Sequence, residues 1–294
     1  MICIVGADGF FGTYISQSVI NSFPDETLVC LDHSDTCEQN TDKVTHKRLE
    51  LSDSSSIDSA IMHLSSYDDI RIIFTAASHN PDIIKSDPGK ASYINGECYE
   101  SFLSKLKGLP VKKLIYTSSD TVYGESRNSY AFKEDDTLAP INIYGEHKKR
   151  AEEITKKYSF SIARYSYLCA PSVTAKKKHF FDTVASSLKK GEKVFMLTDW
   201  VRSAINYKDA ADITLRYLFD SRDINVLNIA SDEALSKYDI GIRIAEYTGA
   251  DTDLIIPCTS DELGIFTEKR ANVLITDNSL MKKLGFSDSI KLNF

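Results

Sequence analysis

Three closely spaced glycines near the start of the chain restrict the folds that it can adopt. Gly6, Gly9 and Gly12 directly follow a short apolar run, Ile2–Val5. Glycine is scarce in the chain as a whole, with only 13 in 294 residues. Glycine permits a tight turn and a close approach of the backbone to a ligand, and a helix that starts there offers N–H groups to phosphates. The spacing therefore predicts a strand–turn–helix unit that binds the pyrophosphate of a dinucleotide. We expect five residues of this turn to contact that cofactor: Gly6, Gly9, Phe10, Phe11 and Gly12.

Apolar runs alternate with helical patterns along the first half of the chain. The runs predict buried strands at Ile2–Val5, Thr27–Leu31, Val44–Leu49, Ile70–Phe74, Lys113–Thr117 and Ser161–Arg164. The helical patterns cover Phe10–Ser22, Ser55–Ser65, Lys90–Lys107 and Ile141–Lys157. This alternation is typical of an α/β fold with a doubly wound parallel sheet, the Rossmann fold.

The alternation becomes irregular after Arg164, which predicts a second domain. Helical patterns follow at Phe180–Lys190, Lys208–Phe219, Lys237–Thr248 and Asn278–Leu284, with one further strand at Val226–Ile229. We expect residues 1–165 to form a dinucleotide-binding domain, with elements near 205–230 returning to it. Residues 166–294 are expected to form mainly a smaller C-terminal substrate-binding domain.

Composition excludes several classes of protein. The net charge of −7 argues against a nucleic-acid or anionic-membrane surface, and no apolar run is long enough to span a bilayer. The first residues lack the basic segment of a secretory signal. The six cysteines are scattered and form no metal-ligand spacing, so we expect reduced thiols, no bound metal and a cytoplasmic location.

An acidic residue ends the second predicted strand. Asp32 lies twenty residues after Gly12, where a carboxylate accepts hydrogen bonds from the adenosine ribose hydroxyls. It would repel a 2′-phosphate, and no arginine follows to bind one. The position favours NAD(H) as the cofactor, with NADP(H) as the alternative. Glu50 and Leu51, after the third strand, are expected at the adenine.

A serine, a tyrosine and a lysine complete a catalytic pattern. Tyr144 and Lys148 are four residues apart on one helical face, and Ser119 ends the preceding strand. A phenol normally titrates near pH 10, and a neighbouring ammonium favours its ionised form. Such a trio is suited to moving a proton while a nicotinamide moves a hydride. We expect Ser119 to hold the reacting oxygen of the substrate.

Taken together, these motifs resemble the extended short-chain dehydrogenases/reductases that modify nucleotide sugars. The glycine turn, Asp32, Ser119, Tyr144 and Lys148 fall in the order of that family. The resemblance implies that Ala76 and Ala77 line the cofactor path and that Asn95 supports the site. It further implies an NAD(P)-dependent enzyme with a nucleotide-sugar substrate.

The residues after Ser119 distinguish branches of the family. Dehydratases carry Thr-Asp-Glu there, whereas this chain has Ser119-Asp120-Thr121 and lacks the second carboxylate. The pattern is similar to the dTDP-4-dehydrorhamnose reductases, which also carry a C-terminal arginine segment like the one around Arg270. A segment around Arg202 instead resembles that of epimerases and dehydratases, and its guanidinium fork would match pyrophosphate oxygens. We expect four residues to bind the substrate: His79, Asp120, Arg202 and Arg270.

Three functions remain open at this point. The resemblance favours NAD(P)H-dependent reduction of a nucleotide-linked 4-keto-6-deoxy sugar. A nucleotide-sugar 4-epimerase with tightly held NAD is the alternative, supported by Asp32 and Arg202. A non-catalytic dinucleotide-binding regulatory subunit is the third, and the intact trio argues against it. Family members are often dimers, so a homodimer is also expected.

Overall fold

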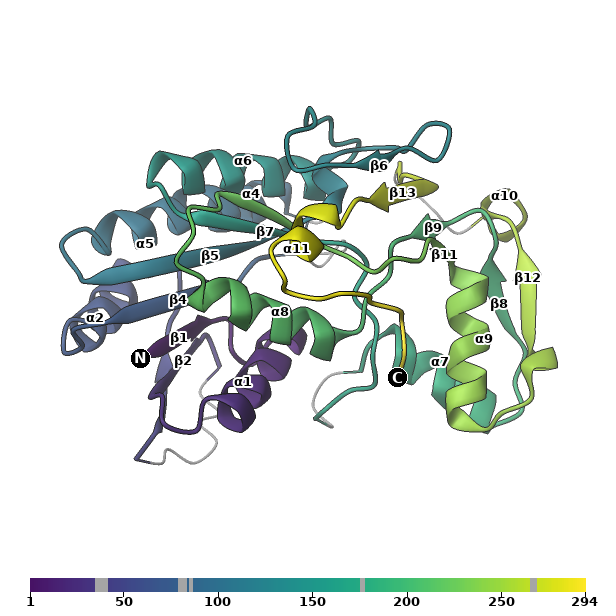
Figure 1. Cartoon of the computed structure of the whole chain (residues 1–294), viewed down its shortest axis with the longest axis horizontal. Helices are drawn as coiled ribbons and strands as arrows, with labels where there is room; N and C mark the ends of the chain where they lie inside the picture. The colour runs from purple at the N-terminus through teal and green to yellow at the C-terminus, as the bar shows by residue number, and fades with distance from the viewer. Residues whose placement is uncertain (35–41, 79–83, 85–86, 175–177, 265–268) are drawn as a thin grey trace. The chain divides into compact units, whose positions relative to one another are not determined.

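The computed structural model describes the chain except for residues 35–41, 79–83, 85–86, 175–177 and 265–268 (Figure 1). The chain divides into two compact units, each made of three segments. The first unit comprises Met1–Ser119, Ile143–Arg164 and Ala211–Leu227. The second unit comprises Asp120–Asn142, Tyr165–Ala210 and Asn228–Phe294.

A seven-stranded sheet is built mainly from the first unit. Its strand order is β10-β7-β5-β4-β1-β2-β3. The strands are β1 (Ile2–Val5), β2 (Leu28–Asp32), β3 (Val44–Arg48), β4 (Ile70–Phe74), β5 (Val111–Ser119), β7 (Ser161–Tyr165) and β10 (Val226–Ile229). From β3 across to β5 every neighbouring pair is parallel. The predicted α/β fold with a doubly wound sheet is confirmed.

The strand order reverses at β1, and this reversal positions the site. The strands β2 and β3 continue on one side of β1, whereas β4 and β5 continue on the other. Chain segments that leave the carboxyl ends of β1 and β4 therefore diverge, and doubly wound sheets bind ligands at such a switch point. The glycine turn directly follows β1 at this edge.

Helices cover both faces of the sheet (Figure 1). Side chains of α2 (Ser54–Leu64), α5 (Tyr99–Lys105) and α6 (Ile143–Lys157) share one apolar core with the strands. In Figure 1, α1 (Phe10–Ser22) and α8 (Tyr207–Phe219) lie on the opposite side of the sheet. Burying apolar side chains on both faces explains why the central strands read as continuous apolar runs.

Two features of the first unit differ from the sequence predictions. The strand at Val44–Leu49 was predicted to be buried, but β3 (Val44–Arg48) is the edge strand and all five of its residues are at least partly exposed. The helix predicted over Lys90–Lys107 is divided into α4 (Pro88–Tyr93), a π-helical turn (Ile94–Cys98) and α5. A π-turn carries one extra residue per turn and is frequent at functional sites.

The second unit contains two small sheets. One has the strand order β11-β9-β13-β6, and the other pairs β12 with β8. These strands are β6 (Ala131–Phe132), β8 (Val194–Leu197), β9 (Val201–Arg202), β11 (Leu235–Ser236), β12 (Ile255–Cys258) and β13 (Val273–Thr276). The helices α7 (Phe180–Lys189) and α9 (Lys237–Thr248) share an apolar core with β8 and β12. Two short helices, α10 (Ser260–Leu263) and α11 (Ser279–Lys283), complete the unit.

Two further observations bear on the class of protein. Among the described helices, none has both the length and the apolar character needed to cross a bilayer. The five described cysteines are free thiols with buried side chains: Cys3, Cys30, Cys98, Cys169 and Cys258.

Replacing Gly12 tests the packing of α1 against the turn. A Cβ at Gly12 would lie 2.2 Å from Gly6 O and 2.8 Å from Ala7 Cα, so backbone must shift to admit it. We expect Gly12→Ala to lower the free energy of unfolding by about 1–3 kcal/mol, as overpacking does. Gly89→Ala is the control, because a Cβ at that exposed helical position meets nothing closer than 3.7 Å. Urea unfolding that shows equal stability for both variants would contradict this packing.

Candidate active site

The glycine turn closely approaches the segment that follows β4. Gly6 has a φ of +89°, a left-handed conformation that side chains disfavour. A Cβ there would lie 2.6 Å from Thr75 Oγ1 and 2.7 Å from Ala76 N. Ala76 N in turn donates to Val5 O at 3.0 Å. These contacts bring the glycine turn and Ala76, both predicted cofactor contacts, to the same edge of the sheet.

The start of α1 is suited to binding phosphate. Its N-cap residue is Gly9, which provides no side-chain cap, and no acidic residue occurs in its first turn. The first N–H groups of a helix have no partner within the helix and favour a negative charge. Phe10, Phe11 and Gly12 form this first turn. The residues present therefore fit the pyrophosphate of a dinucleotide.

Asp32 and Asp8 form an acidic pair at the end of β2. Asp32 Oδ2 accepts a hydrogen bond from Asp8 N at 3.0 Å, and Asp32 Oδ1 accepts one from Ser34 N at 3.3 Å. The Ser34 hydroxyl donates to the Asp8 carboxylate, and His33 Nδ1 lies 2.9 Å from Asp32 Oδ1. Sequence reasoning selected Asp32 and missed Asp8, although Asp8 stands between two of the glycines.

Glu50 and Leu51 follow β3 and lead into α2. The Glu50 carboxylate accepts hydrogen bonds from Ser52 N at 3.2 Å and from Ser52 Oγ at 2.8 Å. The Ser52 hydroxyl is the main reason that the pKa of Glu50 falls below its usual range. The carboxylate thus stabilises the turn before α2, and its contact with adenine stays a prediction.

Asn95 lies in the π-helical turn and holds the segment after β4. Its Oδ1 accepts from Ser78 N at 2.7 Å, and its Nδ2 donates to Ser78 O at 2.9 Å. The same Nδ2 lies 3.3 Å from Nδ1 of His147, which is on α6. Asn95 therefore links α6 to the segment containing Ala76 and Ala77. Its predicted role of supporting the site stays a prediction.

Lys148 is buried against the end of β5. Its Nζ donates to Thr117 O at 2.7 Å, two residues before Ser119, and lies 5.8 Å from the centroid of the Tyr144 ring. The side chain is only 5% exposed. Burial lowers the pKa of Lys148 to about 8, and the nearby Glu152 partly opposes this effect. The structure thus places all three predicted catalytic residues in the first unit, with Tyr144 and Lys148 on one face of α6.

Three of the predicted substrate ligands lie in the second unit. Asp120 directly follows β5 and its side chain is buried. Burial lowers the pKa of Arg202, and the charge of Asp120 partly opposes this effect. The Arg202 guanidinium donates to Val201 O, Asn272 O and Ala271 O at 2.7–3.0 Å. These bonds use three of its five N–H groups. Arg270 is exposed, and its charge also acts on Arg202. His79 lies outside the described residues.

Comparison with known proteins identifies the family. The profile of the RmlD substrate binding domain matches residues 1–288. The chain belongs to this family.

Two curated proteins are similar in sequence to this RmlD-family chain. A probable low-salt glycan biosynthesis reductase of Haloferax volcanii is 26% identical over 255 residues, covering 86% of this chain and 81% of the relative. Methionine adenosyltransferase 2 subunit beta of Xenopus tropicalis is 25% identical over 292 residues, covering 96% and 81%.

Solved structures show the same fold. The dTDP-4-dehydrorhamnose reductase of Bacillus anthracis, solved with NADP, superposes with a TM-score of 0.79 at 19% identity, covering 99% of this chain and 94% of the other. The UDP-glucuronic acid 4-epimerase of Bacillus cereus, solved with UDP-glucuronic acid and NAD, superposes with a TM-score of 0.81 at 19% identity and the same coverage.

A buried ion pair next to Lys148 was missed by sequence reasoning as a site feature. Arg164 Nε donates to Glu152 Oε1 at 2.8 Å, and Arg164 Nη2 donates to Glu152 Oε2 at 2.7 Å. Ser118 Oγ also donates to Glu152 Oε1, at 2.6 Å. The two charged side chains are 2% and 0% exposed. A signal was available, because Glu152 follows Lys148 by one helical turn in this RmlD-family chain.

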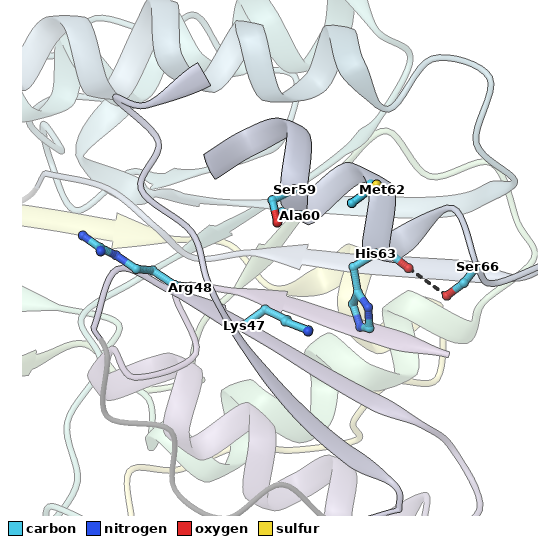
Figure 2. A pocket seen from close by; sticks show the side chains of 7 residues that line it. All are labelled: Lys47, Arg48, Ser59, Ala60, Met62, His63 and Ser66. Carbon is cyan, nitrogen blue, oxygen red and sulfur yellow. Dashed lines mark hydrogen bonds between the residues drawn. The ribbon is translucent and has the colours of Figure 1, made fainter. Parts of the chain in front are cut away.

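A separate pocket of about 370 Å³ lies beside β3 and α2 (Figure 2). Figure 2 shows Lys47 and Arg48 on the strand side and His63 on the helix side, with Ser66 Oγ donating to His63 O. Its described lining includes none of the residues predicted for the catalytic, cofactor or substrate sites.

Replacing Arg164 tests the buried ion pair. Arg164→Met leaves the Glu152 carboxylate buried without its cation, which we expect to cost about 3–5 kcal/mol of unfolding free energy. The double variant Glu152→Gln/Arg164→Met removes both charges and should recover part of this loss. Urea unfolding of both variants measures the difference. A loss below about 1 kcal/mol in the single variant would contradict the coupling.

Proposed function

We propose that this RmlD-family chain reduces the keto group of a nucleotide-linked 4-keto-6-deoxy sugar with a nicotinamide dinucleotide. The observation that carries the proposal is the placement of Lys148. Its ammonium is fixed on Thr117 O at the end of β5, and it lies 5.8 Å from the Tyr144 ring. This arrangement is suited to proton transfer at an oxygen held by Ser119. The relatives named as reductases support the same activity.

Each member of the trio has a separate task in this mechanism. Tyr144 donates its phenolic proton to the carbonyl oxygen as that oxygen becomes an alkoxide. Ser119 donates a hydrogen bond to the same oxygen and so orients the carbonyl. The Lys148 ammonium stabilises the phenolate that remains on Tyr144. A nicotinamide dinucleotide, when bound at the glycine turn, supplies the hydride that the sugar carbon accepts.

The acidic pair at β2 supports the proposal that the cofactor is NAD(H). Asp8 and Asp32 share Ser34 as a hydrogen-bonding neighbour, so two carboxylates lie close together where the adenosine ribose is expected. A 2′-phosphate would bring a further negative charge to them. The Asp32 carboxylate retains acceptor capacity for ribose hydroxyls besides its two backbone bonds.

Residues of the second unit are assigned to the substrate. We propose that Asp120 contacts a sugar hydroxyl, because it immediately follows Ser119 in the chain. We propose that Arg202 and Arg270 bind the diphosphate, for which guanidinium groups are well suited.

Replacing Tyr144 tests the proposed chemistry. We expect Tyr144→Phe to lose about 10²–10⁴-fold in the rate of NADH oxidation by a nucleotide-linked 4-keto sugar, because the proton donor is removed. Cofactor binding, measured by fluorescence titration, should change little. Retention of the wild-type rate by Tyr144→Phe would disprove the mechanism.

The wild-type protein separates the alternative functions in the same assay. A 4-epimerase would interconvert nucleotide sugars and consume no added cofactor. A regulatory subunit would bind the cofactor and turn over no keto sugar. Stoichiometric loss of NADH supports only the reductase.

Replacing Asp8 tests the cofactor assignment. We expect Asp8→Asn to raise kcat/KM for NADPH relative to NADH by about tenfold, because one of the two repelling charges is removed at nearly constant side-chain size. Asp32→Asn should also reduce the efficiency with NADH, since Asp32 is the ribose ligand. Asp53→Asn is the control, as Asp53 caps α2 and bonds Ser55 instead. An unchanged ratio in Asp8→Asn would refute its role.

A further inference from the structure

Lys237, the first residue of α9, is surrounded by aromatic rings of the second unit. Its Nζ lies 3.8 Å from the centroid of the Phe180 ring, 4.7 Å from that of Tyr167 and 4.8 Å from that of Trp200. Within the described part of the chain it donates one hydrogen bond, to Tyr167 Oη at 3.2 Å. The residue as a whole is partly exposed, and its ammonium lies among the rings. No residue of this aromatic cage was selected from the sequence as a ligand.

The cage holds a cation without an acidic partner among the described residues. Burial lowers the pKa of Lys237 to about 8, and the charges of Arg202 and Arg270 lower it further, whereas the Cys169 thiol raises it. The charges of Asp120 and Glu125 raise the pKa of Arg202, whereas neither contributes to the pKa shift of Lys237. A largely buried ammonium near two guanidinium groups is destabilised by desolvation and by repulsion. Cation–π contacts offset only part of this cost.

The neighbouring arginine extends the same cationic surface. Arg202 stacks on Trp200, with its guanidinium carbon 4.2 Å from the ring centroid. Trp200 therefore contacts both Lys237 and Arg202, and it fixes the two cations relative to one another. A lysine has three N–H donors, and only one is bonded to Tyr167. The remaining donors suit an acceptor that carries several charged oxygens.

We propose that Lys237 binds a phosphate oxygen of the nucleoside diphosphate portion of the substrate, an inference that rests on the nucleotide-sugar reductase function proposed above. A diphosphate carries enough negative charge to pair with the ammonium and with the nearby guanidinium groups. The aromatic cage then positions the ammonium, because the surrounding rings restrict its movement. Lys237 is thus assigned as a substrate-binding residue besides Arg202 and Arg270.

Calorimetric titration of the full-length protein with dTDP, UDP, GDP and CDP tests the proposal without cofactor or turnover. We expect Lys237→Met to weaken binding of the preferred diphosphate by about tenfold or more, because a charged hydrogen bond is lost. Lys237→Arg, which keeps the charge, should bind more tightly than Lys237→Met. Lys193→Met, at an exposed lysine of the same unit, is the matched control and should bind like the wild type.

The pH dependence gives a readout that misfolding would not mimic. Between pH 7 and pH 9 the wild-type affinity should fall as Lys237 loses its proton. Tyr167, Cys169, Arg202 and Arg270 are the other titratable or charged groups that face it. This fall should be absent in Lys237→Arg and in Lys237→Met. Thermal melting of each variant checks that it is folded.

Three results would overturn the proposal. One is a Lys237→Met affinity within twofold of wild type, and another is a pH dependence that survives in that variant. The third is inorganic phosphate or pyrophosphate binding as tightly as every nucleoside diphosphate, which would indicate a site for free anions. Failure of the reductase function is distinguishable, because the wild-type protein would then oxidise no NADH with a keto sugar while diphosphate binding still depended on Lys237.

Discussion

Charges buried where α6 packs against β5 and β7 are the interaction on which the rest of the catalytic site depends. Lys148 donates to Thr117 O, and one helical turn later Glu152 binds both Arg164 and Ser118. Leaving any of these charges without its partner would be costly in a protein interior. Helix α6 is therefore fixed in register on the strands. That register in turn fixes Tyr144, which lies one turn before Lys148 on the same helix.

The proposed binding of anions by this acidic chain depends on local features rather than on its overall charge. The net charge is −7, yet the start of α1 has no acidic residue in its first turn. In the second unit, Lys237 and Arg202 share Trp200 as an aromatic neighbour. Acidic groups stand instead at the end of β2, where Asp8 and Asp32 suit hydroxyl groups rather than a phosphate. In the proposed function, these residues complement the chemistry of the two ends of a dinucleotide and of a sugar nucleotide.

The first unit was predictable from the sequence because its central strands are buried on both faces. Continuous apolar runs located β1 and β4 to the residue, and the glycine spacing located the turn after β1. The edge strand β3 was misjudged, since strand pattern alone does not tell an edge from the centre of a sheet. The π-turn containing Asn95 was missed because one extra residue leaves the helical pattern almost unchanged.

The second unit was less predictable for a different reason. Its strands β6, β9 and β11 have two residues each, too short for any periodicity to show. Lys237 was overlooked because its aromatic neighbours come from three separated segments of the chain. Tyr144 and Lys148 could be selected as candidates because they are close in sequence, and the catalytic role of the trio stays a prediction. The roles of the cofactor and substrate residues remain predictions.

Transfer of a labelled hydride tests the central claim most directly. The protein would be incubated with a nucleotide-linked 4-keto-6-deoxy sugar and NADH carrying deuterium at the transferable position of the nicotinamide. The proposed function predicts one deuterium in the sugar of each product molecule, detected by mass spectrometry, with an equal amount of NAD⁺ formed. A sugar product without deuterium, formed with no loss of the reduced cofactor, would contradict it.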